Sequence, residues 1–101
     1  MTSNVGKLTV KQIHAIHRST NNFVGLMKLK LMENADKGLW DKESYEYLRS
    51  RVNDELIELD TKIASGEYLN ARLECADAAN FLMMISDNIS YGKFEEFKKG
   101  R

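Results

Sequence analysis

Four acidic residues in the middle of the chain have a spacing that suits metal chemistry. They form two pairs, Glu55-x-x-Glu58 and Glu74-x-x-Asp77, with 15 residues between the pairs. Residues three apart lie on the same face of a helix, so each pair would present two carboxylates side by side. Carboxylate oxygens are ligands that Mg²⁺ accepts, together with water and phosphate. The two pairs therefore predict a divalent-metal site with all four acids as ligands.

Such a site would act on phosphate groups. A divalent cation held by carboxylates orients a phosphate chain, polarises a phosphoryl oxygen and lowers the pKa of a bound water. A nucleoside triphosphate carries the negative charge that complements the metal. We therefore expect Glu55, Glu58, Glu74 and Asp77 to bind the metal, with Mg²⁺ as the cofactor and Mn²⁺ as an alternative ion. The sequence does not assign the general base among them.

The two pairs differ in what else they could be. An E-x-x-E pair is common on a solvated helix face, and Arg51 and Lys62 could form intrahelical ion pairs with the first one. The second pair lies in a segment whose apolar side chains surround nearly the whole helix, so its acids need a partner. The alternative for that pair is a polar seam against basic residues of the other helices. The apolar residues of this segment are Leu69, Leu73, Cys75, Ala76, Ala78, Ala79, Phe81, Leu82, Met83, Met84, Ile85 and Ile89.

Helices must position these acids, because no segment shows sustained strand alternation. Thr9-Val-Lys-Gln12 matches a capping box, Asp41 is the expected cap of a second helix, and Gly38, Gly66 and Gly92 separate the helical segments. We expect an all-α fold, a small four-helix-type bundle in a single domain spanning 1–101 and completed by oligomerisation. The expected helices cover about 10–35, 42–64 and 67–89, with a short C-terminal helix within 93–101.

Composition excludes several classes of protein. The chain has 15 basic and 15 acidic residues, so it lacks the excess positive charge of a nucleic-acid-binding protein. No apolar run is long enough for a membrane span, and the single cysteine, Cys75, excludes an internal disulfide framework. We expect a cytoplasmic protein. His14 and His17 are three residues apart, but a metal site needs a fuller ligand set, so we expect them to have a surface or packing role.

The ordered acidic pairs resemble the signature of the MazG-like all-α nucleoside triphosphate pyrophosphohydrolases. The segment from about Leu29 to Ile89 is similar to short, stand-alone members that bacteriophages often carry, and the host cytoplasm would then be the location. The resemblance implies Mg²⁺-dependent hydrolysis of (d)NTP to (d)NMP and pyrophosphate, with deoxynucleotides as the expected substrates, by a homodimer or homotetramer. It also implies that Glu55, Glu58, Glu74 and Asp77 are catalytic. The segments that carry it, besides the acidic pairs, are Lys30-Leu-Met-Glu-Asn34, Lys37-Gly-Leu-Trp40 and Glu74-Cys-Ala-Asp-Ala-Ala-Asn-Phe81.

The resemblance makes four further residues candidates for substrate binding. Asn34, Lys37 and Trp40 belong to the first connection between helices, where the lysine could contact phosphate and the indole could stack on the base. Asn80 follows the second acidic pair by one helical step and could bind the sugar or a water on the metal. The alternative roles are a packing anchor for Trp40 and a structural amide for Asn80.

Two other functions are compatible with the same residues. One is a catalytically silent helical module that binds a partner protein. The other is hydrolysis of phosphoribosyl-ATP, which uses a related helical scaffold. The sequence predicts neither the base nor the biological role.

Overall fold

The structure is a computed structural model that describes residues 5–94, and these residues form helices and turns without any strand. The all-α prediction is therefore confirmed for the described residues. None of the described helices is both long and apolar enough to cross a membrane. The elements are η1 (Val5–Lys7), α1 (Val10–Glu33), η2 (Ala35–Lys37), α2 (Tyr45–Ala64) and α3 (Tyr68–Ser90), where η marks a 3₁₀ helix.

The predicted capping box begins α1. The Thr9 hydroxyl oxygen accepts a 3.1 Å hydrogen bond from the backbone N–H of Gln12, and the Gln12 side chain accepts a 2.9 Å bond from the N–H of Thr9. This reciprocal pair satisfies two of the N–H groups that the first turn leaves without a helical partner. The helix ends at Glu33, two residues before the predicted end, and Asn34 is its C-cap.

The predicted start of the second helix was wrong. Ser44, not Asp41, caps α2, because its Oγ accepts a 3.1 Å hydrogen bond from the N–H of Tyr47. The chain turns first at Gly38, whose φ of 84° suits glycine, and the N–H of Glu43 bonds to the carbonyl of Trp40 at 3.0 Å. This turn occupies the residues that were expected to form the first helical turn.

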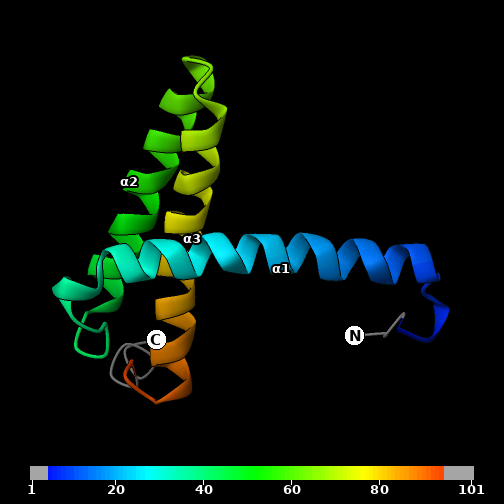
Figure 1. Ribbon diagram of the computed structural model, residues 1–101. Helices are drawn as coiled ribbons and strands as arrows, with labels where there is room; N and C mark the ends of the chain where they lie inside the picture. The colour runs from blue at the N-terminus through cyan, green and yellow to red at the C-terminus, as the bar shows by residue number, and fades with distance from the viewer. Residues whose placement is uncertain (1–4, 95–101) are drawn as a thin grey trace.

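α2 and α3 form an antiparallel hairpin that α1 crosses steeply (Figure 1). Gly66 closes α2 as predicted: its φ is 74°, and the N–H of Glu67 returns to the carbonyl of Lys62 at 2.9 Å. The C-terminal half of α1 lies on α3, while its N-terminal half projects beyond the hairpin (Figure 1). The described part of the chain is thus a hairpin with a crossing helix, rather than four aligned helices. Residues 91–94 form a turn, and the rest of the predicted C-terminal helix lies outside the described residues.

The core is small and belongs to the hairpin. Leu48 and Val52 of α2 pack against Ile85 of α3, with Tyr45, Phe81, Met84 and Phe94 around them. A single chain does not cover all the apolar side chains of α3, because Leu69, Leu82 and Ile89 are each more than half exposed. One chain of this size has too little interior to cover every apolar face of a helix. The outward-facing Ile57 on α2 is 65% exposed.

Candidate active site

A pocket of about 650 Å³ lies where the C-terminal half of α1, the α1–α2 connection and the hairpin meet. It has both charged and apolar walls, and its apolar residues include Leu31, Phe81 and Met84. All eight residues predicted for the site line this pocket. They are Asn34, Lys37, Trp40, Glu55, Glu58, Glu74, Asp77 and Asn80.

Three of the four predicted metal ligands come together. Glu55 and Glu58 of α2 and Glu74 of α3 each contribute one carboxylate oxygen, and these three oxygens lie within 4.8 Å of one another. Glu55 is buried, Glu74 is partly buried and Glu58 is exposed, so the group spans the pocket from its floor to its rim. Oε2 of Glu74 is buried and has no hydrogen-bond partner among the described residues. Three hard oxygen donors with one unsatisfied buried oxygen fit a divalent cation of the Mg²⁺ type.

The carboxylates perturb one another strongly. Burial, together with the neighbouring carboxylates of Glu58 and Glu55, raises the pKa of Glu74 to about 8. Burial also raises the pKa of Glu55, whereas the hydrogen bond with Glu74 lowers the pKa of Glu58. Without a cation, the group therefore keeps a proton on Glu74 near neutral pH. A divalent ion would take the place of that proton.

Arg51 holds Glu55 in position. Its Nη2 donates a 3.0 Å hydrogen bond to Oε1 of Glu55, and its Nη1 donates a 2.8 Å bond to Oδ2 of Asp54. The guanidinium carbon also lies 5.2 Å from the ring centroid of Phe81. The sequence indicated intrahelical ion pairs between Arg51 and the first acidic pair, but gave Arg51 no place in the site.

Asp77 stands apart from the three glutamates. Its Oδ2 lies 3.7 Å from Nζ of Lys30 on α1, and the same ammonium group donates a 3.1 Å hydrogen bond to Oε2 of Glu33. Burial raises the pKa of Asp77, and the charge of Lys30 opposes that effect. The second acidic pair thus combines both alternatives: Glu74 joins the carboxylate group, and Asp77 pairs with a basic residue of the first helix.

Asn80 joins α3 to α1. Its side chain is only 3% exposed, and its Nδ2 donates a 3.0 Å hydrogen bond to the backbone carbonyl of Met27. Its Oδ1 is also buried, without a hydrogen-bond partner among the described residues. The amide is therefore structural through its nitrogen, while its oxygen remains available as an acceptor in the pocket wall.

The α1–α2 connection forms another wall. Nε1 of Trp40 donates a 2.9 Å hydrogen bond to Oδ2 of Asp87, and the backbone carbonyl of Trp40 accepts a 3.0 Å bond from Nδ2 of Asn88. Asn34 donates from its side chain to the carbonyl of Lys30 at 2.8 Å, which satisfies the end of α1. Lys37 is exposed at the end of η2.

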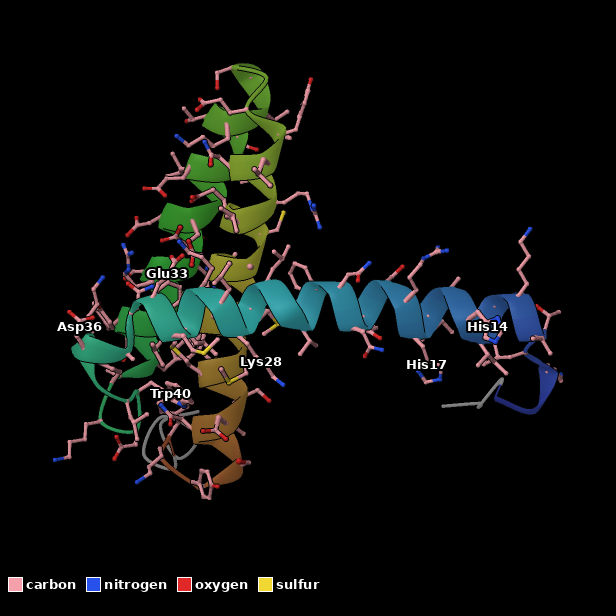
Figure 2. The ribbon with its side chains drawn as sticks, in the orientation of Figure 1. His14, His17, Lys28, Glu33, Asp36 and Trp40 are labelled. Atoms are coloured by element: carbon pink, nitrogen blue, oxygen red, sulfur yellow. The ribbon has the colours of Figure 1, made fainter. Side chains whose placement is uncertain are left out.

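Figure 2 shows the two histidines on the projecting half of α1, away from Trp40. Neither His14 nor His17 lines the pocket, and both are exposed. This position agrees with the expected surface role.

A comparison of the chain with protein-family models, curated proteins and solved structures found no match. The resemblance to MazG-like enzymes therefore depends on the acidic pairs and the segments around them.

Proposed function

We propose that this protein is a Mg²⁺-dependent nucleoside triphosphate pyrophosphohydrolase that acts on deoxynucleotides and releases a nucleoside monophosphate and pyrophosphate. One observation carries the proposal: carboxylates of Glu55, Glu58 and Glu74 lie within 4.8 Å of one another in a pocket that also has basic and aromatic walls. The donor set suits a hard cation, and the volume of the pocket is in the range of small-molecule sites. The spacing of the acidic pairs supports the same activity by resemblance.

Each side chain would have its own role at the metal. Glu55, Glu58 and Glu74 would hold the ion, Arg51 would fix the carboxylate of Glu55, and Asp77 would complete the ligand set. A bound Mg²⁺ would supply Lewis-acid chemistry at the phosphate and lower the pKa of water. One of the carboxylates would accept the proton of the attacking water.

The remaining walls suit the rest of a nucleotide. Lys37 and Trp40 both line the pocket. The ammonium group of Lys37 would contact phosphate, and the ring of Trp40 would stack on a base. Oδ1 of Asn80 offers a buried acceptor for a sugar hydroxyl or a water. These contacts would orient the α-phosphate relative to the carboxylates.

Product analysis tests the activity directly. The purified protein is incubated with Mg²⁺ and each common ribo- and deoxynucleoside triphosphate, and with phosphoribosyl-ATP, and the products are separated. We expect monophosphate and pyrophosphate from a deoxynucleotide, and no turnover when EDTA removes the metal. Diphosphate with phosphate as products, or turnover of phosphoribosyl-ATP alone, would contradict the proposal. Absence of any turnover would favour the partner-binding alternative.

We also propose that the enzyme is a homo-oligomer. Apolar side chains remain exposed on α2 and α3, including Ile57, Leu69 and Leu82, and on the projecting half of α1, including Val10 and Ile16. Exposed apolar side chains on several faces of so small a chain favour burial against a second copy. Light scattering coupled to size exclusion should give at least twice the chain mass of 11.6 kDa. Ile57→Glu should lower that mass, and a wild-type mass of one chain would refute the assembly.

A further inference from the structure

Lys30 stands between two carboxylates, one inside the pocket and one outside it. Its side chain is 20% exposed, and its Nζ lies 3.7 Å from Oδ2 of Asp77, which lines the pocket. The same nitrogen lies 3.1 Å from Oε2 of Glu33, which is 53% exposed and does not line the pocket. The ammonium group therefore has one partner at the candidate site and a second partner away from it.

The crossing of α1 over α3 fixes Lys30 opposite Asp77. Nδ2 of Asn80 donates a 3.0 Å hydrogen bond to the carbonyl of Met27, and Met27 and Lys30 are one turn apart on α1. Asp77 and Asn80 are likewise one turn apart on α3, so the two contacts are in register on facing sides of the helices. The position of Lys30 is thus set by a buried hydrogen bond rather than by its own flexible side chain.

The ammonium group of Lys30 can readily leave Asp77 for another acceptor. A separation of 3.7 Å is too long for a hydrogen bond, so charge attraction alone joins the two groups. An ammonium group is a point charge on a flexible stem and turns readily to another acceptor. Arg51 differs, because two hydrogen bonds of 2.8 and 3.0 Å already hold its guanidinium group on Asp54 and Glu55.

We propose that Lys30 is a built-in counter-ion of Asp77 that a divalent cation displaces, and that the displaced ammonium group then binds the phosphate chain of the nucleotide. A cation at Asp77 would repel the ammonium group, which has Glu33 as its nearest other acceptor. A nucleotide brings phosphate oxygens to the same pocket, and these are stronger acceptors for a lysine. Lys30 therefore opposes binding of the metal alone and favours binding of the metal together with the nucleotide.

This inference rests on the proposed function, but its test uses binding rather than turnover. Mn²⁺ is titrated alone into the full chain, and an α,β-imido deoxynucleoside triphosphate is then titrated at saturating Mg²⁺, both followed by calorimetry. Lys30→Met removes the charge and keeps the length of the side chain. Lys28→Met is the matched control, because Lys28 is exposed on the same helix and does not line the pocket (Figure 2).

Lys30→Met should change the affinities for Mn²⁺ and for the imido nucleotide in opposite directions. Lys30→Met should bind Mn²⁺ about threefold more tightly, as expected when a competing partly exposed ion pair is removed, and the imido nucleotide about tenfold or more weakly. Lys28→Met should match the wild type in both. Lys30→Arg keeps the positive charge, so its Mn²⁺ affinity should stay within about twofold of the wild type. It also serves as the test if circular dichroism shows that Lys30→Met does not fold.

Several results would overturn the inference. Weaker Mn²⁺ binding by Lys30→Met, unchanged nucleotide binding, or tighter Mn²⁺ binding by Lys30→Arg would each refute the role of Lys30. If the wild type releases pyrophosphate but Lys30→Met leaves both titrations unchanged, this inference fails and the proposed function stands. If the wild type hydrolyses no nucleotide but the opposite shifts are seen, the proposed function fails and the counter-ion role stands. A wild type that binds neither Mn²⁺ alone nor the imido nucleotide with Mg²⁺ refutes both.

Discussion

The side-chain amide of Asn88 on α3 donates a 3.0 Å hydrogen bond to the backbone carbonyl of Trp40, 48 residues earlier in the chain. The preceding residue, Asp87, accepts a 2.9 Å hydrogen bond from the indole Nε1 of the same tryptophan. Two successive residues of α3 therefore hold both the backbone and the ring of Trp40. This contact turns the connection between α1 and α2 into a fixed wall of the pocket.

Asn88→Ala should destabilise the fold. Asn88 is only 1% exposed, and its removal leaves the carbonyl of Trp40 without this hydrogen bond. We expect a loss of about 1–3 kcal/mol in the free energy of unfolding, measured by urea denaturation. Asn22→Ala is the control, because Asn22 is exposed on α1 and its replacement should cost little. Equal stability of Asn88→Ala and the wild type would show that the contact contributes nothing.

Glu58→Gln and Asp77→Asn should each abolish turnover while leaving the helical content nearly unchanged. Both substitutions keep the shape of the side chain and remove a charge that we assign to metal binding. Since even outer partners of metal ligands contribute 10–100-fold, we expect pyrophosphate release to fall by about a hundredfold or more. Asp60→Asn on the exposed surface of α2 should retain activity. Full activity in either pocket variant would remove that residue from the site.

The metal-free protein should lose stability as the pH rises from about 5 to 9. The pKa of Glu74 rises from an ordinary 4.5 to about 8 on folding, so between these values the folded state holds a proton that the unfolded state has released. The unfolding free energy therefore falls as pH increases through this range. Burial raises the pKa values of Glu55 and Asp77 in the same direction.

Melting temperatures at pH 5, 7 and 9 in EDTA test this dependence. The glutamine side chain of Glu74→Gln does not titrate, so the melting temperature of this variant should change less between pH 5 and pH 9. Mg²⁺ binding at pH 7 should release protons, which calorimetry in buffers of different ionisation enthalpy would detect. A stability that rises from pH 5 to pH 9 in EDTA would contradict the assignment.

Trp40 is the only tryptophan in the chain, so its fluorescence reports on one wall of the pocket. Stacking of a base on the indole should quench the emission when a non-hydrolysable deoxynucleotide is added with Mg²⁺. Inorganic pyrophosphate should produce a smaller change, because it carries no base. Equal changes with both ligands would indicate that Trp40 senses the phosphate chain or a movement of the wall, and would refute stacking.

Local signals in the sequence predicted much of the fold. The capping box at Thr9 and the glycine that closes α2 depend on a few neighbouring residues, and both are present. The start of α2 could not be predicted in this way. Asp41 is as good a cap as Ser44 by residue type, and the segment between them is held in a turn by contacts of Trp40 with residues of α3 more than 40 positions away.

In the candidate site too, spacing within a helix was predictive, whereas contacts between distant helices could not be predicted. The spacing of Glu55, Glu58 and Glu74 predicted carboxylates on two neighbouring helices, and antiparallel packing brings them together. The pairing of Asp77 with Lys30 depends on the angle at which α1 crosses α3, and periodicity within one helix carries no information about that angle. For this reason the sequence left the polar-seam alternative open and assigned Lys30 no role.

The elements that form the pocket differ in how much core they contribute, since α1 lies on one side and the hairpin on the other. No residue of α1 is fully buried, and the cluster of Leu48, Val52 and Ile85 lies entirely within the hairpin. Local opening of α1 therefore costs less than opening of the hairpin, which keeps the three glutamates in place. In the proposed enzyme, local opening of α1 would let the products leave while the metal ligands of the hairpin stay in place. The contacts that this opening would have to break are the hydrogen bond of Asn80 with Met27 and the ion pair of Asp77 with Lys30.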